Sequence, residues 1–279
     1  MNFRPDDDDD SDDEIDPFKS AMLPPQLQEA AVTVDQENQL QNVEESKYYL
    51  ASIASNLVIR QVPSEGISFQ LWPAATTLVT LLDNLIRHPE IPTDGALSKL
   101  FETKDGNRPL RILELGSGTG LVGIAAAAVL GANVTVTDLP RVIPNLRFNI
   151  EANSEILKIN GGEVIPAALS WGETGHMEAL GRDYDLMLGS DLVYHDHLYA
   201  PLIETVKWFL LGNGGKELVF VMAHLKRWKK ESAFFKMAKK LFDVQVIHTD
   251  PPLPGTRVGV VVYKFVGRGT FPNGNSELR

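Results

Sequence analysis

The segment ILELGSGTGLVG, residues 112–123, constrains the fold of this chain more than any other feature. A short apolar run that breaks into closely spaced glycines is typical of a buried strand, a tight turn and the start of a helix. The residues after the turn are apolar and rich in alanine, and this helical pattern is expected to end at Gly131. The segment therefore predicts a strand–loop–helix unit whose glycine loop binds a ligand.

Downstream of this unit, strand-like apolar segments alternate with helical patterns. Such alternation predicts an α/β fold, with a doubly wound, mostly parallel sheet that is covered by helices on both faces. The last two strands have no helix between them, which predicts an antiparallel C-terminal hairpin at one edge. The expected strands lie within residues 110–115, 133–138, 162–172, 184–194, 216–225, 243–249 and 257–266, and the expected helices within 120–131, 140–154 (opened by Pro140), 197–211 and 231–242.

Composition divides the chain into three parts. The net charge of the 279 residues is −11, but residues 1–20 hold nine acidic and two basic side chains, which leaves −4 for the rest. We expect residues 1–25 to be a disordered acidic tail that aids solubility, because like charges repel and cannot bury surface. Residues 26–105 are expected to form an N-terminal extension, and residues 106–279 the main domain.

The extension is expected to be small and β-rich. Residues 47–62 and 66–72 have strand-like composition, which predicts a hairpin with Gly66 at its turn. Residues 73–86 predict an amphipathic helix with Pro73 at its first position, where a missing N–H costs nothing. Residues 92–109 are rich in breakers and predict a linker.

Composition also excludes several classes of function. The chain has no cysteine, which excludes disulfides, thiolate metal sites and a cysteine nucleophile. No apolar run approaches the roughly 20 residues of a membrane span, and the acidic N-terminus lacks a secretory signal. We therefore expect a cytoplasmic protein that can also be nuclear and has no membrane partner. A nucleic-acid partner is not expected, since a basic face is lacking. The protein is expected to be a monomer. No metal is expected, because His195 and His197 lack further ligands nearby, and basic residues 226–230 are interpreted as a solvated loop before a helix.

Polar or aromatic residues follow four of the expected strands, at the point where each strand ends. In open α/β sheets, ligands bind outside the carboxyl ends of the strands, so we expect these residues to line one site. They are Glu114 with the loop 116–120, Asp138, Ser170 with Trp171, and Ser190 with Asp191.

The glycine loop matches two ligand patterns. Gly118, Gly120 and Gly123 form the G-x-G-x-x-G of dinucleotide sites, and Asp138 follows about twenty residues later to bind a ribose. Glu114 and the loop glycines also form E-x-G-x-G-x-G, a pattern associated with S-adenosylmethionine. An acid at the mouth of the loop would repel a pyrophosphate but attract the ammonium and sulfonium groups of S-adenosylmethionine. This charge favours the methyl donor as the cofactor.

Five segments carry a resemblance to a known family: LWPAA (71–75), ILELGSGTGLVGIAAA (112–127), VTVTDLPRVIPNLRFNI (134–150), LSWG (169–172) and GSDLVYHDHLYAPLIETV (189–206). The chain resembles the seven-β-strand (class I) methyltransferases, and within them lysine methyltransferase family 16, the methyltransferase-like 21 group. TDLP followed by NLRFNI and SDLVY in register is more specific than the glycine loop, which the whole class shares. The resemblance implies a Rossmann-like, seven-stranded sheet.

The resemblance also implies the reaction, the transfer of a methyl group from S-adenosylmethionine to the side-chain amine of a lysine in a protein substrate. It assigns Asp191 and Tyr194, an acid-x-x-Tyr motif, to the incoming amine. Asp191 is expected to act by charge pairing and positioning rather than as an obligate base, and the Tyr194 ring by cation–π contact. The implied cofactor contacts are Trp72, Gly116, Ser117 and Gly118 at the methionine end, Asp138 at the ribose, Leu139 and Trp171 at the adenine, and Ser190 beside the substrate entrance.

Other functions stay open at this point. A class I methyltransferase acting on a small molecule or another acceptor is one alternative, although SDLVY lacks the Pro-Pro that base-methylating enzymes place after the fourth strand. An NAD-linked oxidoreductase would need a Tyr-x-x-x-Lys set that is not evident in the sequence. A non-catalytic scaffold would keep the fold without needing the site residues. The acidic tail and the C-terminal end have no counterpart in the resemblance and leave the substrate unassigned.

Overall fold

The computed structural model describes residues 43–88, 108–212, 218–252 and 259–268. The acidic tail expected at residues 1–25 and the start of the main domain at residue 106 lie outside the described residues, as does most of the expected linker. The division into an extension and a main domain therefore stays a prediction.

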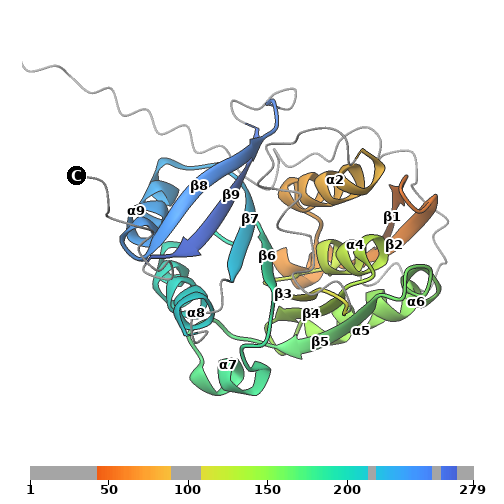
Figure 1. The fold of residues 1–279 in the computed structure, drawn as a ribbon, viewed down its shortest axis with the longest axis horizontal. Helices are drawn as coiled ribbons and strands as arrows, with labels where there is room; N and C mark the ends of the chain where they lie inside the picture. The colour runs from red at the N-terminus through yellow and green to blue at the C-terminus, as the bar shows by residue number, and fades with distance from the viewer. Residues whose placement is uncertain (1–42, 89–107, 213–217, 253–258, 269–279) are drawn as a thin grey trace, which may run out of the picture.

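A seven-stranded sheet forms the centre of the described structure (Figure 1). Its order is β5-β4-β3-β6-β7-β9-β8. Neighbouring strands from β5 to β7 pair in parallel, while β9 is antiparallel to both β7 and β8. The mostly parallel sheet and its antiparallel edge hairpin are thus confirmed. The strands are β3 (Arg111–Leu115), β4 (Asn133–Asp138), β5 (Glu163–Ala168), β6 (Leu186–Ser190), β7 (Val219–Leu225), β8 (Phe242–Thr249) and β9 (Val260–Gly267).

Helices cover both faces of the sheet, and β7 shows this most directly. Its side chains alternate between two cores: Val219 and Val221 belong to one, Phe220 and Met222 to the other. Period-two alternation between apolar layers is what a strand buried on both faces requires. The first core includes α2 (Pro73–Arg87), α4 (Leu121–Leu130) and α5 (Ile143–Ala152), and the second α7 (Thr174–Leu180), α8 (Tyr199–Leu211) and α9 (Ser232–Leu241).

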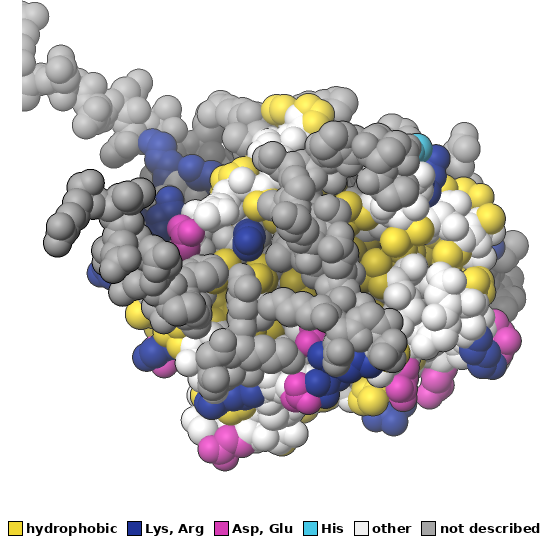
Figure 2. Space-filling view, in the orientation of Figure 1, with side chains coloured by type: hydrophobic (Ala, Val, Ile, Leu, Met, Phe, Trp, Pro, Cys, Tyr) yellow, Lys and Arg dark blue, Asp and Glu magenta, His cyan; other side chains and the backbone are white. Residues whose placement is uncertain are grey.

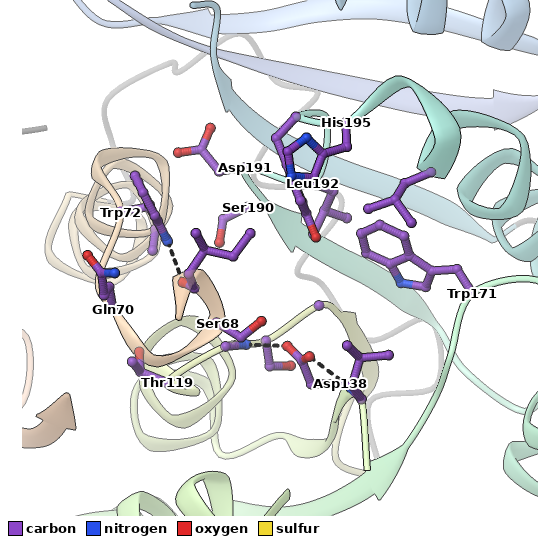
Figure 3. A pocket seen from close by; sticks show the side chains of 18 of the residues that line it. Ser68, Gln70, Trp72, Thr119, Asp138, Trp171, Ser190, Asp191, Leu192 and His195 are labelled. Carbon is purple, nitrogen blue, oxygen red and sulfur yellow. Dashed lines mark hydrogen bonds between the residues drawn. The ribbon is translucent and has the colours of Figure 1, made fainter. Parts of the chain in front are cut away.

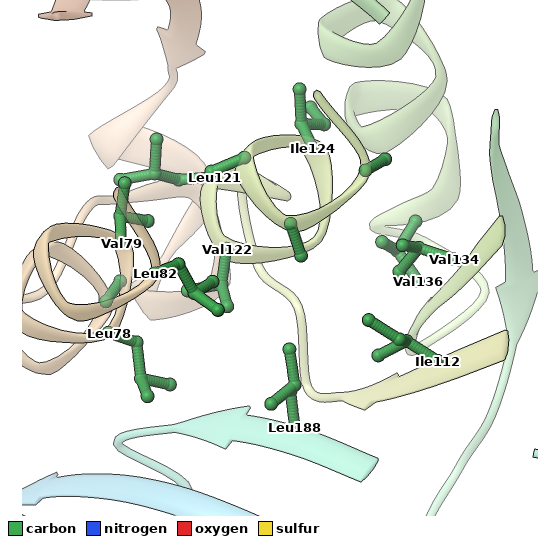
Figure 4. Packing of buried hydrophobic residues seen from close by; sticks show 14 of the residues in the cluster. Leu78, Val79, Leu82, Ile112, Leu121, Val122, Ile124, Val134, Val136 and Leu188 are labelled. Atoms are coloured by element: carbon green, nitrogen blue, oxygen red, sulfur yellow. The ribbon is translucent and has the colours of Figure 1, made fainter. Parts of the chain in front are cut away.

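Helix α4 packs on the sheet beside α2 and also contacts β2 and α6, which explains why it is apolar on all sides (Figure 4). The small alanine side chains let α4 approach the sheet closely, and at Gly123 the backbone of α4 packs directly against side chains of β3 and β4. A Cβ on Gly123 would overlap Val136 Cγ1 of β4 and the Glu114 carboxylate of β3. The third glycine of the loop pattern therefore serves helix–sheet packing.

The N-terminal hairpin differs from the expectation. Strands β1 (Glu44–Leu50) and β2 (Ser55–Gln61) pair antiparallel, but the turn lies at residues 51–54 and not at Gly66. Asp83 of α2 fixes this turn, because its carboxylate accepts bonds from the backbone N–H groups of Ala51 and Ser52 at 3.1 and 2.9 Å. A distant side chain thus determines the position of the turn, which local composition could not show.

Residues 66–72, expected as a strand, form a short 3-10 turn, η4 (Ile67–Phe69), followed by extended chain. Gly66 has φ +112° and separates η4 from another 3-10 turn, η3 (Pro63–Glu65). The backbone reverses here because Val62 donates to the Phe69 carbonyl at 2.9 Å. The segment then enters α2, where Pro73 occupies the first turn as predicted.

One helix prediction needs correction, and two short helices were not predicted. Helix α5 begins at Ile143 and not at Pro140, since residues 139–142 form a turn closed by the Val142 N–H and the Leu139 carbonyl. Pro144 then falls in the first turn of α5, where proline is tolerated. Helix α7 and the four-residue helix α6 (Ser154–Leu157) were not expected as separate elements.

Two asparagines, Asn149 in α5 and Asn153 directly after it, attach the hairpin to the main sheet's helices. The Asn153 side chain accepts from Val58 N at 2.9 Å and donates to Val58 O at 2.7 Å. Asn149 does the same with Arg60, at 2.8 and 3.1 Å. Two amides four residues apart, one in α5 and one at its C-terminal end, thereby satisfy the free edge of β2 as a neighbouring strand would.

Candidate active site

A cavity of about 670 Å³ opens at the carboxyl ends of the parallel strands (Figure 3). This volume lies within the range of small-molecule and cofactor sites. Twelve of the expected site residues line it: Trp72, Gly116, Ser117, Gly118, Thr119, Asp138, Leu139, Ser170, Trp171, Ser190, Asp191 and Tyr194. The cavity brings together the ends of β3, β4 and β6 with the segment before α2, as an open α/β sheet predicts.

The glycine loop forms the floor of this cavity. Gly118 has φ +56°, and a Cβ there would lie 3.1 Å from the Ser68 carbonyl oxygen of η4. Ser117 extends the sheet, since its N–H donates to Thr137 O at 2.8 Å and its hydroxyl accepts from Thr137 N at 3.0 Å. Only a glycine fits position 118 without strain, because the loop turns there with left-handed backbone against a neighbouring chain.

Asp138 lies at the end of β4 beside the loop. Its Oδ2 accepts from Gly118 N and its Oδ1 from Leu139 N, both at 2.8 Å (Figure 3). Burial raises the pKa of Asp138, and the two N–H bonds counteract this rise. Each carboxylate oxygen keeps a further acceptor site, and the side chain faces the cavity. This geometry suits hydrogen bonding to the two hydroxyls of a ribose.

Glu114 does not lie at the mouth of the loop. Its side chain is fully buried beneath the loop, against α4, and it does not line the cavity. Burial raises its pKa from 4.5 to about 8, more than the neighbouring Ser117 hydroxyl and Gly123 N–H lower it. The side chain is therefore protonated at neutral pH. The expectation that Glu114 places a negative charge at the mouth of the loop, which favoured a cationic cofactor, is wrong.

The wall formed by the N-terminal segment was only partly foreseen. Trp72 lines the cavity, and its indole N–H donates to the Ile67 carbonyl at 2.9 Å, which fixes the ring (Figure 3). Ser68 and Gln70 lie beside it on the same wall. Ser68 and Gln70 were not predicted as site residues, because residues 66–72 were expected to form a strand. Their polar side chains, between apolar residues and next to Trp72, could have indicated a cavity wall.

Asp191 follows β6 and has left-handed backbone, with φ +52°. Its Oδ1 accepts from Leu225 N at 2.9 Å, and Arg227 Nη2 lies 2.9 Å from its Oδ2. Arg227 and His224 hold the pKa of Asp191 down at about 2, against the opposing effect of burial. Asp191 is therefore an anion that is already paired, and it is not placed to act as a base.

The sequence suggested that the basic segment 226–230 is a solvated loop, and this is wrong for part of the segment. Arg227 is largely buried and lines the cavity together with Trp228 and Lys230. Lys226 and Lys229 are exposed, as expected. The partner of Arg227 is 36 residues away in the sequence, so the charge pattern alone could not reveal the pair.

The other expected site residues border the cavity without charge. Burial raises the pKa of Tyr194 to about 12, so its phenol is neutral. Trp171, Leu139 and Ser190 are partly exposed on the cavity wall, which leaves surface for a ligand to cover. Among the described residues, no group of three or more His, Cys, Asp or Glu side chains is arranged to hold a metal ion.

The strand order and the cavity at the strand ends define a class I methyltransferase, whose methyl donor is S-adenosylmethionine. A family model described as lysine methyltransferase matches residues 52–241. The chain belongs to this lysine methyltransferase family. The match includes the second strand of the hairpin, the cavity and α9. No helix in the described ranges is both long and apolar enough to cross a membrane.

Individual relatives carry matching names. Protein N-lysine methyltransferase METTL21A of Danio rerio is 35% identical over 140 residues, which are 50% of this chain and 61% of that protein. METTL21A of Mus musculus is 34% identical over 186 residues, 67% of this chain and 73% of the relative. EEF1A lysine methyltransferase 3 of Mus musculus is 32% identical over 185 residues, which are 65% of this chain and 73% of that protein. The zebrafish alignment thus spans less than two thirds of its relative.

Proposed function

We propose that this protein transfers a methyl group from S-adenosylmethionine to the side-chain amine of a lysine in a protein substrate. Family membership supports the reaction, and the single structural observation that carries it is the arrangement of Asp138 and the glycine loop. The loop lines the cavity with backbone, and the Asp138 carboxylate lies beside it, bonded to Gly118 N. This arrangement fits the ribose of an adenosyl group, and membership of the lysine methyltransferase family favours the methyl donor over a dinucleotide.

The lining residues fit the proposed cofactor in three parts. Asp138 would hold the ribose through its remaining acceptor sites. Leu139 and Trp171 would enclose the adenine, and Trp72 with residues 116–118 would border the methionine end, Ser117 serving to hold the loop in place. When bound, S-adenosylmethionine supplies a methyl group activated by a sulfonium. The chain's own work is then to align an amine with that methyl group and to exclude water.

The acceptor end of the cavity would lie at Ser190, Asp191 and Tyr194. A lysine amine has an ordinary pKa of about 10.4 and must lose its proton before it can attack. The Tyr194 ring, which is neutral and faces the cavity, would guide the side chain. Asp191 would act by fixing the shape of this end, because its charge is already compensated.

Surface charge supports a protein acceptor over a nucleic acid. On the face shown in Figure 2, Lys and Arg side chains lie beside Asp and Glu along the lower part of the molecule. A nucleic-acid site would instead gather positive charge on one face. The mixed surface of the described residues on this face fits a protein partner.

The test is transfer of labelled methyl groups into dialysed cell lysate by the purified full chain. We expect the label to survive nuclease, to be released by protease, and to map to lysine. Label lost to nuclease, or found in small molecules only, would overturn the proposal. In parallel, a thermal-shift assay should show stabilisation by S-adenosylmethionine and S-adenosylhomocysteine but not by NAD, since a ligand of the folded state raises the melting temperature.

A further inference from the structure

A polar cluster that the proposed reaction leaves unexplained surrounds Arg227. Its guanidinium makes two contacts with Asp191, at 2.9 and 3.3 Å, and donates to the Leu225 carbonyl at 3.1 Å. Its carbon Cζ lies 5.3 Å from the centre of the Trp72 ring. Arg227 thus connects the end of β6 with the wall before α2, and it does so on the surface of the cavity.

The position of Arg227 is itself fixed from behind. Glu231, which is fully buried, accepts from Arg227 N at 3.0 Å and lies 3.1 Å from His224 Nε2. The other ring nitrogen of His224 lies 3.6 Å from Asp191 Oδ1. The cluster therefore contains two carboxylates, a guanidinium and an imidazole. It joins β6, β7 and the turn before α9, and it leaves Arg227 little freedom to move.

This arrangement bears on how an amine is received. A lone carboxylate at the acceptor end would hold the incoming lysine as an ammonium, the form that cannot attack. Arg227 already occupies both oxygens of Asp191, and its own positive charge faces the same space. A neighbouring cation disfavours the charged form of an amine. The amine therefore meets an ion pair whose charges compensate each other. A free Asp191 anion would instead stabilise the protonated amine.

We infer that Arg227 is a positioning residue that keeps Asp191 paired and so makes the cavity receive the acceptor lysine as a neutral amine. The inference rests on the proposed function and extends it to a residue outside the acid-x-x-Tyr motif. The groups that face the Asp191 carboxylate are Arg227 and His224, with Glu231 behind them. Lys230 on the cavity wall adds positive charge of the same sign as Arg227.

The experiment compares Arg227→Gln, Arg227→Lys and the wild type. The acceptor is heat-treated, dialysed lysate protein, and the limiting rate at saturating cofactor and acceptor is measured from pH 6 to 10. This rate reports ionisation in the bound state. We expect Arg227→Gln to shift the midpoint of the rise to higher pH by about 1–3 units, the range for a charge placed next to a titrating group. The acceptor concentration for half-saturation should not increase.

Arg227→Lys keeps the charge but loses the two-pronged contact, so its midpoint should stay at the wild-type value while its limiting rate falls. Lys229→Gln is the matched control, because it removes a neighbouring exposed cation that does not line the cavity. It should leave both rate and midpoint unchanged. A midpoint for Arg227→Gln equal to that of the wild type, or an equal shift in Arg227→Lys, would overturn the inference.

The double variant Asp191→Asn/Arg227→Gln covers the case in which Arg227→Gln fails to fold, because it leaves no buried charge unpaired at this position. Its midpoint should lie close to that of the wild type, because the anion that would trap the proton is removed together with its cation, and a midpoint raised by a unit or more would contradict the inference. Calorimetry with S-adenosylhomocysteine verifies the cofactor site of each variant. Absence of lysine label with the wild type would refute the proposed function itself, whereas an unshifted midpoint in Arg227→Gln with an active wild type refutes only the role of Arg227.

Discussion

Asn149 of α5 binds the backbone of Arg60 in β2 through both ends of its amide, at 2.8 and 3.1 Å, as a strand residue would. The same amide nitrogen donates to the Thr119 carbonyl of the glycine loop at 2.9 Å. One buried side chain therefore joins the N-terminal hairpin, α5 and the floor of the cavity. This contact gives a physical role to NLRFNI, the segment that made the family resemblance specific.

Asn149→Ala should destabilise the protein by about 2–4 kcal/mol, because it leaves an N–H and two carbonyl groups without partners. Chemical denaturation measures this change. Arg147→Ala, on the exposed side of the same helix, is the control and should change the free energy of unfolding by less than about 0.5 kcal/mol. Equal stability of the two variants would show that the hairpin is held by other contacts.

Gly118→Ala should weaken both folding and cofactor binding. Left-handed backbone costs a non-glycine residue about 1–2 kcal/mol, and the new Cβ would press on the Ser68 carbonyl, 3.1 Å away. Relief of that contact would move η4, which lies beside the cavity wall. We expect a lower melting temperature together with weaker binding of S-adenosylhomocysteine in calorimetry.

Gly175→Ala provides the comparison for Gly118. A Cβ at Gly175 would meet nothing within 4 Å, and the residue lies in α7. Alanine there should be neutral or stabilise the helix by up to about 1 kcal/mol. If Gly118→Ala behaved in the same way, the close packing of η4 on the loop would not matter for the site.

The parts of the fold that the sequence predicted are those governed by local pattern. The strands β3 to β7 and the helix after the glycine loop follow from apolar periodicity and from Gly131, whose left-handed backbone ends α4. The hairpin turn could not be placed, since Asp83 determines it from 31 residues away. For the site, strand ends predicted which residues line the cavity, but not that Arg227 pairs with Asp191. Charge partners depend on which loops meet, and one sequence does not contain that information.

Glu114 should make stability fall as pH rises. Its pKa is raised from 4.5 in the unfolded chain to about 8 in the folded protein, so between these values the folded state binds the extra proton. Stability due to this group is complete below about pH 4.5 and declines by up to about 1.4 kcal/mol per pH unit until about pH 8. Glu114→Gln removes the titration, so its stability relative to the wild type should increase over this window.

Denaturation of Glu114→Gln and the wild type at pH 5, 6.5 and 8 measures that difference. Glu163→Gln, an exposed residue at the start of β5, is the control and should show no such trend. Because Glu114 does not line the cavity, cofactor affinity should be kept in Glu114→Gln. A stability difference that is the same at all three pH values would mean that Glu114 is ionised in the folded protein.

Asp191→Ala should abolish methyl transfer and keep cofactor binding. The change removes the partner of Arg227 at the acceptor end, while the glycine loop and Asp138 keep their contacts. We expect a loss of at least tenfold in the rate, which corresponds to about 1.4 kcal/mol of activation free energy. Asp196→Ala is the control, since that side chain is 77% exposed and outside the cavity lining. Calorimetry and labelled-methyl transfer are measured on the same preparations. Lost cofactor affinity with normal turnover at saturating cofactor would place Asp191 in the cofactor site instead and remove it from the acceptor end.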